Sequence, residues 1–160
     1  MAIKVGDRIP AAKLRTMGGE GPKEIATDEI FKGKKVVLFA VPGAFTPTCS
    51  AKHVPGFVAE ADAIRKKGVD TIACLSVNDP FVMGAWAKDQ KSDGKVLMLA
   101  DGNGDFTKAL GLEMDGSRFG LGSRSQRYAM VVEDGVVKTL NVEAPGAFEV
   151  SSAEAILKAL

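Results

Sequence analysis

The sequence is poor in the residues that build metal sites and disulfide frameworks. It has two cysteines and one histidine in 160 residues. Structural zinc sites need a full set of Cys and His ligands, and small secreted scaffolds need several cysteine pairs. Neither class fits, and no metal site is expected. The two thiols are either buried fillers or reactive groups in a reducing compartment.

Long apolar runs and a surplus of one charge are also missing. The longest uninterrupted apolar run covers residues 36–41, far short of the roughly 20 residues of a membrane-spanning helix. Lys and Arg total 21 against 20 Asp and Glu, whereas a nucleic-acid binder usually carries a basic surplus. We therefore expect neither a membrane nor a nucleic acid as a partner.

The composition is that of a globular protein with its own core. Hydrophobic residues make up 46% and charged residues 26% of the chain, as in ordinary folded domains. The length predicts one domain over residues 1–160. Residues 1–7 lack the apolar core of a signal peptide. We therefore expect a cytoplasmic protein, or an organellar one if a transit peptide has been removed.

Hydrophobic periodicity predicts alternating strands and helices. Strands are expected at residues 13–16, 36–41, 71–77, 96–100, 128–132 and 136–142. Helices are expected at residues 28–31, 49–67, 80–89, 105–110 and 151–160, and an irregular loop at 111–126. Early strand–helix–strand units and a late hairpin predict an α/β fold, a mixed central sheet with helices on both faces. This order fits a thioredoxin-like architecture.

Local residue choices predict how the helices begin and bend. Proline removes a backbone hydrogen bond, so Pro55 is expected to kink the helix over residues 49–67. Ser151 is expected to form a capping box with Glu154. The helix caps predicted in all are Thr27, Asp79, Asp105 and Ser151.

Cys49 stands where a thiolate would be favoured. It follows a buried strand and a loop stiffened by Pro42 and Pro47, and it falls in or just before the first turn of a helix. Free N–H groups and the helix dipole favour an anion at that position. Thr46 precedes it by three residues, so the Thr46 hydroxyl could reach the sulfur. The alternative is that Cys49 is a small filler.

Cys74 lies in the middle of a predicted strand, which favours a buried, inert thiol. The alternative is a resolving thiol for Cys49, which needs Cα atoms within about 7 Å or local unfolding. The two cysteines are 25 positions apart, and Thr46 takes the place of the first cysteine of a thioredoxin-type Cys-x-x-Cys pair. The sequence therefore indicates single-thiolate rather than dithiol chemistry.

Two further side chains are candidates for this site. His53 follows Cys49 by four residues, on the same face of an α-helix. It either pairs with Cys49 as a base or is a half-buried polar residue that steers the site. Arg127 directly precedes a predicted strand, so a rigid element would hold its guanidinium in a fixed place.

Several segments resemble the peroxiredoxins. Residues 42–49, PGAFTPTC, match the active-site pattern Pro-x-x-x-Thr-x-x-Cys of that family. Residues 50–57, 76–83 and 127–135 match one branch, which contains the fifth mammalian peroxiredoxin and the plant type II enzymes. The matching segments span nearly the whole chain in order, so the resemblance covers the chain and not only one motif.

The resemblance implies a thioredoxin fold and a thiol peroxidase for hydrogen peroxide and alkyl hydroperoxides, without a metal or organic cofactor. Cys49 would be the peroxidatic cysteine and would become a sulfenic acid. Thr46 would bond sulfur and peroxide, Pro42 would shield the pocket, and Arg127 would lie beside the thiolate. The sulfur must then be open to solvent. The residues expected to complete the peroxide site are Gly43, Phe45, Thr48 and His53.

The resemblance also bears on partners. The branch typically forms homodimers, so Phe45, Phe81 and Trp86 are candidate contacts. Its mammalian members place a resolving cysteine after the last strand, whereas residues 145–152 here contain none. An external thiol, either glutaredoxin with glutathione or thioredoxin, is therefore expected as the reductant. The plant relatives carry a cysteine that matches Cys74, which keeps its resolving role open.

Two other functions stay open. Cys49 and His53 could form the nucleophile and base of an acyl or thiol transferase. Cys49 could instead serve a redox sensor that is oxidised once and turns over slowly.

Overall fold

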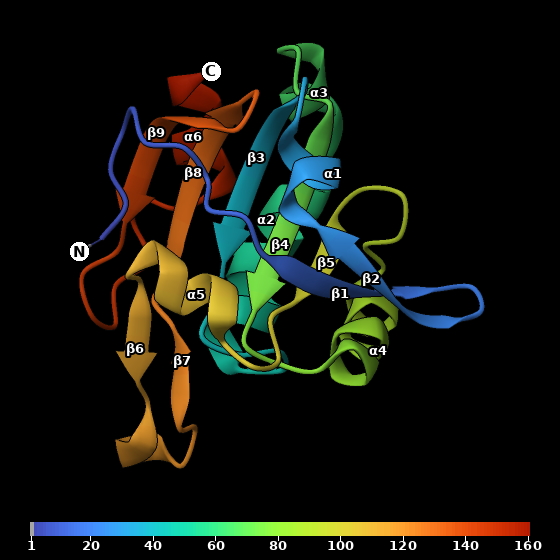
Figure 1. The fold of residues 1–160 in the computed structure, drawn as a ribbon, viewed down its shortest axis with the longest axis vertical. Helices are drawn as coiled ribbons and strands as arrows, with labels where there is room; N and C mark the ends of the chain where they lie inside the picture. The colour runs from blue at the N-terminus through green and yellow to red at the C-terminus, as the bar shows by residue number, and fades with distance from the viewer. Residues whose placement is uncertain (1) are drawn as a thin grey trace.

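A seven-stranded sheet with the order β2-β1-β5-β4-β3-β8-β9 forms the centre of the molecule (Figure 1). The computed structural model describes residues 2–160. Strands β3, β4 and β5 run parallel, and the other neighbours pair antiparallel. This confirms the predicted mixed sheet. The strands are β1 (Lys13–Gly18), β2 (Gly21–Ala26), β3 (Lys35–Ala40), β4 (Thr71–Ser76), β5 (Leu97–Ala100), β8 (Tyr128–Glu133) and β9 (Val136–Val142).

Helices cover both faces of the sheet. One apolar cluster joins the sheet to α2, α3, α4 and α6, and a second joins its other face to α1 and α5. The helices are α1 (Thr27–Phe31), α2 (Val54–Ala59), α3 (Ala61–Lys66), α4 (Pro80–Gln90), α5 (Asp105–Leu110) and α6 (Ala153–Ala159), with a π-helical turn η1 (Cys49–His53) and a 3-10 turn η2 (Ser117–Phe119). Within residues 2–160, no helix combines the length and apolarity needed to cross a bilayer.

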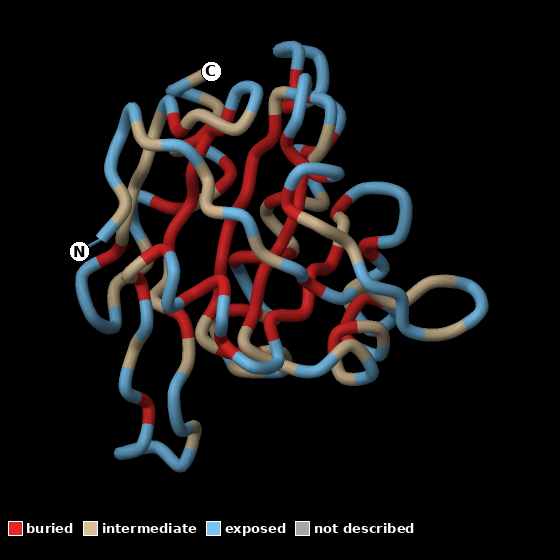
Figure 2. Tube along the Cα trace, viewed as in Figure 1, coloured by how far each residue is buried: buried red, intermediate tan, exposed pale blue. Residues whose placement is uncertain are grey.

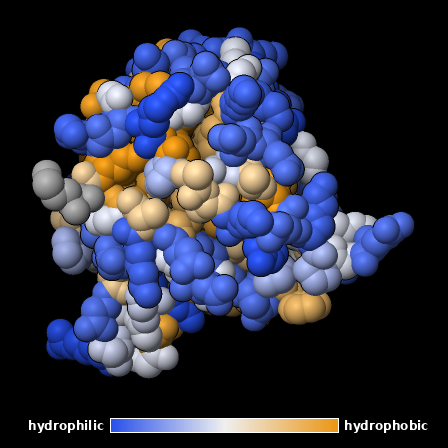
Figure 3. All heavy atoms as spheres, in the orientation of Figure 1, coloured by the Kyte–Doolittle hydropathy of each residue, from blue (hydrophilic) through white to orange (hydrophobic). Residues whose placement is uncertain are grey.

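Strand β3 explains why the sequence of a central strand is a continuous apolar run. Val37 and Phe39 point into the cluster under α2, while Val36 and Leu38 point into the cluster under α1. A strand covered on both faces needs apolar residues at every position. Figure 2 shows the buried residues following the central strands, and Figure 3 shows polar residues over most of one outer face.

Two hairpins differ from the sequence-based expectation. Residues 18–21 turn tightly between β1 and β2, where only a glycine-rich loop was expected. Strand β2 carries polar residues and Pro22 at the edge of the sheet, so it lacks an apolar signal. Residues 111–126 are not an irregular loop: β6 (Glu113–Asp115) and β7 (Ser123–Ser125) form a separate hairpin. In Figure 1 this hairpin extends away from the body.

The helix expected over residues 49–67 is divided. The Val54 N–H donates to the Cys49 carbonyl in the π-helical turn η1, directly before Pro55. Pro55 has no N–H to continue the α-helical ladder, so the expected distortion appears one turn earlier. A second break falls at Glu60, which separates α2 from α3.

One of the four predicted caps is confirmed and three are wrong. The Asp79 carboxylate accepts from the Val82 N–H at 2.8 Å and caps α4. Ser152, not Ser151, caps α6, because the Ser151 hydroxyl donates to Glu143. The Asp101 carboxylate accepts from the first N–H groups of α5 in place of Asp105. Thr27 is the first residue of α1, and its hydroxyl bonds the segment of residues 10–12.

Candidate functional site

Cys49 lies in the first turn of the helical segment that follows β3. Helical backbone begins at Pro47, and the Ser50 N–H donates to the Thr46 carbonyl. Within residues 2–160, no backbone or side-chain acceptor receives the N–H of Thr48 or of Cys49. These are the free donors that a helix start presents to an anion.

Arg127 contacts the Cys49 sulfur, although the two residues are far apart in the sequence. Its Nη2 donates to Cys49 Sγ at 3.1 Å. Strand β8 runs antiparallel beside β3, with Tyr128 opposite Ala40. Residue 127 therefore lies at the edge of the sheet where β3 ends and the Cys49 helix begins. The sheet brings together two residues 78 positions apart.

His53 is bonded on both ring nitrogens. Arg127 Nη1 lies 2.8 Å from His53 Nδ1, and His53 Nε2 lies 2.9 Å from the Ser151 carbonyl oxygen. A guanidinium only donates and a carbonyl only accepts, so Nδ1 accepts and Nε2 carries the proton. His53 is therefore neutral. Burial, and then the charge of Arg127, lower the pKa of His53 to about 3.

This geometry contradicts the expected pairing of Cys49 with His53. The lone pair of Nδ1 is taken by Arg127, and within the described residues His53 makes no hydrogen bond to the sulfur. The π-helical turn also removes the α-helical spacing on which that pairing rested. A transferase that uses His53 as the base for Cys49 has no support in this arrangement.

The loop between β3 and Cys49 is braced by β7. Arg124 Nη1 donates to the Pro42 carbonyl at 3.3 Å, and its Nε donates to the Leu121 carbonyl at 2.9 Å. A Cβ atom at Gly43 would stand only 2.8 Å from Arg124 Nη1. Glycine therefore permits the close approach. The Thr46 hydroxyl donates to the Gly43 carbonyl at 2.7 Å rather than to the sulfur.

The sulfur is not open to solvent, so that expectation is wrong. Cys49 is 0% exposed. A cavity of about 660 Å³ lies between the start of the Cys49 helix, the β6–β7 hairpin and residues 143–147. Pro42, Thr46, Thr48 and Arg127 line this cavity, whereas Cys49 does not. Ligand in the cavity would meet these side chains before it met the sulfur.

The other predicted residues lie around this centre. Phe45 is 53% exposed, has a φ of +64°, and its ring lies 6.4 Å from that of Trp86. Trp86 is fully buried, so its expected role as a contact to a second subunit is wrong. Its Nε1 instead donates to the Ser50 hydroxyl at 3.0 Å.

Cys74 is a free, fully buried thiol in β4, in the same apolar cluster as Cys49. Burial, and then the neighbouring Cys49, raise the pKa of Cys74 well above its ordinary value. A thiol that resists ionisation is a poor nucleophile. The burial that the sequence context of Cys74 favoured is therefore present.

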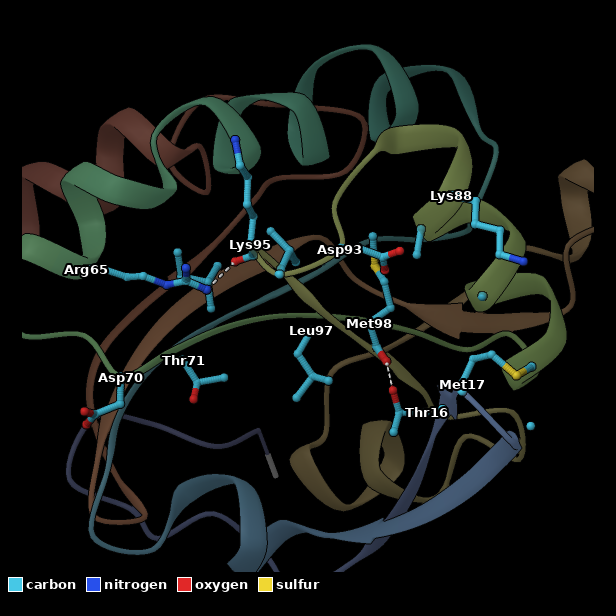
Figure 4. Close-up of a pocket in the computed structure, with 18 residues that line it drawn as sticks. Thr16, Met17, Arg65, Asp70, Thr71, Lys88, Asp93, Lys95, Leu97 and Met98 are labelled. Atoms are coloured by element: carbon cyan, nitrogen blue, oxygen red, sulfur yellow. Dashed lines mark hydrogen bonds between the residues drawn. The ribbon is translucent and has the colours of Figure 1, made fainter.

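A second cavity, of about 730 Å³, lies at the opposite edge of the sheet, where β4 and β5 begin (Figure 4). The Thr16 hydroxyl donates there to the Met98 carbonyl, and Arg65 donates to the Lys95 carbonyl. The residues that line it include no cysteine and no histidine. Across residues 2–160, no group of three or more His, Cys, Asp or Glu could hold a metal ion.

The sequence did not predict two residues that contact Arg127 and His53, which are Phe148 and Ser151. Phe148 packs its ring 5.0 Å from that of His53 and 5.8 Å from the Arg127 guanidinium carbon. Ser151 supplies the carbonyl that fixes the His53 tautomer. These residues lie in a loop with no motif, and only the fold brings them to Cys49.

Comparisons with known proteins identify the family of this chain. The chain matches the Redoxin family over residues 4–157. It is 54% identical over 163 residues to Peroxiredoxin-2E, chloroplastic, of Arabidopsis thaliana, an alignment that covers 99% of the chain and 70% of the relative. It is 52% identical over 159 residues to Peroxiredoxin-2C of Oryza sativa subsp. japonica, covering 99% and 98%.

Solved structures agree with the fold. Reduced Prx3 from Vibrio vulnificus in complex with hydrogen peroxide superposes with a TM-score of 0.95 at 58% identity, over 98% of each chain. Peroxiredoxin 5 from Alvinella pompejana superposes with a TM-score of 0.87 at 38% identity, over 98% of this chain and 96% of the other. The thioredoxin-like architecture predicted from the order of elements is confirmed. With a family match over nearly its full length and about half its residues shared with complete peroxiredoxins, the chain belongs to the redoxin family and is a peroxiredoxin, an enzyme of the thiol peroxidase class.

Proposed function

We propose that this chain reduces hydrogen peroxide and alkyl hydroperoxides through a sulfenic acid on Cys49. The single observation that carries the proposal is the 3.1 Å hydrogen bond from Arg127 Nη2 to Cys49 Sγ. A guanidinium at that distance favours the charged form of the sulfur, which is the nucleophile. The free N–H groups of Thr48 and Cys49 add two further donors.

The reaction is an in-line displacement. The Cys49 thiolate attacks the terminal oxygen of ROOH, the S–O bond forms, and the O–O bond breaks. The released RO⁻ takes up a proton and leaves as ROH, and Cys49 remains as a sulfenic acid. Negative charge spreads over the sulfur and both oxygens in the transition state, so donors fixed beforehand lower the barrier. No metal or organic cofactor enters the reaction.

Each neighbour has a proposed role in that step. Arg127 stabilises the thiolate and the developing charge. Thr46 holds the peroxide through its hydroxyl, whose proton is committed to Gly43 and whose lone pairs remain available. Pro42 and Thr48 wall the cavity beside the sulfur. Phe45 and Gly43 shape the loop, and neutral His53 orients Arg127 without exchanging protons.

The burial of Cys49 sets a condition on access. Peroxide enters the cavity beside Thr46, Thr48 and Arg127, and these side chains must move for it to reach the sulfur. Hydrogen peroxide is close to water in size, so small side-chain motions suffice.

We propose an external thiol as the reductant, either glutaredoxin with glutathione or thioredoxin. The thiol attacks the sulfenic acid, releases water and forms a mixed disulfide, which a second thiol reduces to free Cys49. The absence of a cysteine from residues 145–152 supports this. So does the raised pKa of buried Cys74, which disfavours a resolving role.

We further propose that the chain acts as one domain in the cytoplasm, serves redox homeostasis and assembles as a homodimer. The exposed rings of Phe45 and Phe81 support the dimer. Two of the relatives are named as chloroplastic proteins, so an organelle is the alternative compartment.

The test compares the wild-type protein with Cys49→Ser and Cys74→Ser. Peroxide consumption is measured with dithiothreitol and with glutathione plus glutaredoxin. We expect Cys49→Ser to abolish turnover and Cys74→Ser to retain it. After one equivalent of peroxide, mass spectrometry should find one added oxygen on the Cys49 peptide alone. Turnover by Cys49→Ser near the wild-type rate would disprove the proposal, and oxidation without turnover would favour the redox sensor.

A further inference from the structure

One buried carboxylate fastens the loop behind the site. Glu143 is 7% exposed, and its Oε2 accepts from the N–H groups of Glu149, Val150 and Ser151 at 2.8, 2.9 and 2.8 Å. The Ser151 hydroxyl donates to the same oxygen at 2.7 Å. Four hydrogen bonds to one carboxylate oxygen hold the backbone of residues 149–151 in a single position.

The electrostatics of Glu143 agree with a charged carboxylate at this point. Burial raises its pKa, but the Ser151 hydroxyl and the three backbone N–H groups donate to the charged form and outweigh burial. The net pKa of Glu143 therefore lies below its ordinary value. Bonds to a charged acceptor are shorter and stronger than those to a neutral one.

Glu143 is also attached to Arg127. Its backbone N–H donates to the Arg127 carbonyl at 2.9 Å. The same residue thus bonds the main chain of Arg127 on one side and the loop on the other. The loop returns to the site through the Ser151 carbonyl on His53 and the Phe148 ring over Arg127.

We propose that Glu143 is a positioning residue for the peroxidase reaction, which holds residues 148–151 so that they fix His53 and thereby aim Arg127 at Cys49. This inference rests on the proposed function. Glu143 itself does not contact the sulfur. It acts through two links, the Ser151–His53 bond and the His53–Arg127 bond. Moving a catalytic group by about 1 Å can slow a reaction by about 100-fold.

The experiment measures oxidation of the reduced, full-length protein by hydrogen peroxide in a stopped-flow instrument. Trp86 is the only tryptophan and bonds Ser50, next to Cys49, so its fluorescence reports the reaction. We expect Glu143→Ala to lower the second-order rate constant between about 10-fold and 100-fold. Glu143→Gln, which keeps one acceptor oxygen, should lose less. Glu154→Ala, an exposed glutamate on α6, is the matched control and should match the wild type.

The amplitude of the fluorescence change separates positioning from loss of structure. A folded variant with a displaced guanidinium should react more slowly but at full amplitude, because every molecule still reaches the same oxidised state. A variant that is only partly unfolded would lose amplitude at an unchanged rate constant, and this result would overturn the proposal. Circular dichroism identifies the variants that fold.

A double-mutant cycle tests the route through His53. His53→Phe removes both ring nitrogens and keeps an aromatic ring against Phe39, Phe57 and Phe148. If Glu143 acts through His53, its substitution costs little in the His53→Phe background. Additive losses, or an unchanged rate in a folded Glu143→Ala protein, would overturn the proposal. If Glu143→Ala does not fold, Glu143→Gln takes its place in the cycle. A wild-type protein that peroxide does not oxidise would instead contradict the proposed function.

Discussion

His53 can accept the hydrogen bond from Arg127 only while its ring is uncharged. A protonated ring would carry a hydrogen on Nδ1 and would no longer accept from Arg127. It would also place a second positive charge against the guanidinium. The buried pocket formed by Phe39, Phe57 and Phe148 keeps the neutral form by excluding water from the ring. In this geometry the only histidine of the chain accepts from Arg127 and donates to the Ser151 carbonyl, so its Nδ1 lone pair is not free to take a proton.

This burial makes folding stability depend on pH. His53 has a pKa of about 3 in the folded protein and an ordinary value of 6.5 when unfolded. Between these values only the unfolded chain binds the proton, so stability falls as the pH falls. From pH 7 to pH 5 we expect the free energy of unfolding to drop by about 2 kcal/mol. Urea titrations at a fixed protein concentration measure this.

The control for that measurement is His53→Phe. This variant should lose most of the slope between pH 7 and pH 5, because no other histidine titrates there. Glu143, whose pKa is lowered, adds its own loss of stability only as the pH falls below its ordinary value of 4.5. A wild-type protein equally stable at pH 7 and pH 5 would show that His53 is not buried in its neutral form.

At the scale of elements, the β6–β7 hairpin is a brace for the active-site loop. Its contact to that loop is the Arg124 guanidinium on the Pro42 carbonyl. The Gly43 carbonyl next to it receives the Thr46 hydroxyl. A shift of Pro42 would therefore also shift Thr46, which we place at the peroxide.

Arg124→Ala should weaken this brace. A hydrogen bond from a charged donor contributes about 1.5–3 kcal/mol, so we expect kcat/KM for hydrogen peroxide to fall by about tenfold or more. Arg118→Ala, on the exposed turn η2 of the same hairpin, is the matched control and should leave kcat/KM unchanged. Steady-state kinetics of both variants decide the question. Equal kcat/KM values for Arg124→Ala and the wild type would show that the hairpin does not support the loop.

Elements with a strong local signal could be predicted from the sequence. The buried runs of β3, β4 and β8 are apolar at almost every position because helices cover both faces of the sheet. The short strands β6 and β7 and the edge strand β2 have no such signal. The wrong caps failed for another reason, since tertiary partners take the hydroxyls of Thr27 and Ser151. Local sequence does not specify those partners.

The same division applies to the site. The position of Cys49 in a first helical turn depends on neighbouring residues, and the sequence predicted it. The roles of Arg124, Phe148 and Glu143 depend on contacts with segments far along the chain. The Arg124–Pro42 bond spans 82 positions, and the His53–Ser151 bond spans 98. Such contacts leave no spacing pattern that a single sequence could show.

At the scale of the whole molecule, strand pairing brings the residues of the site together where β3 ends. Strand β8 begins there beside β3, and residues 143–151 follow β9 on the far side of β8. Cys49, Arg127 and Glu143 thus come from three regions of the chain whose order is set by strand pairing. Two aromatic rings near this end of the sheet, Phe45 and Phe81, are exposed to solvent in the single subunit.

Phe45 and Phe81 are exposed rings on two segments that a hydrogen bond joins. The Ala44 N–H donates to Asn78 Oδ1 at 3.0 Å, which ties the Phe45 loop to the start of α4, where Phe81 is 64% exposed. Phe45 also holds a φ of +64°, a conformation unfavourable for a residue with a Cβ. A second copy of the chain that covers both rings would remove this apolar surface from water.

Phe81→Arg should therefore weaken the proposed homodimer. A charge placed in a buried interface must lose its water without gaining a partner, which costs more than the lost contact alone. We expect the dissociation constant, measured by sedimentation equilibrium, to rise by about 100-fold or more. Phe119→Arg is the matched control, because Phe119 is 77% exposed at the end of the β6–β7 hairpin, and it should sediment as the wild type does. A wild-type protein that is monomeric at every concentration would contradict the homodimer, and a Phe81→Arg protein that stays fully dimeric would place the interface on another face.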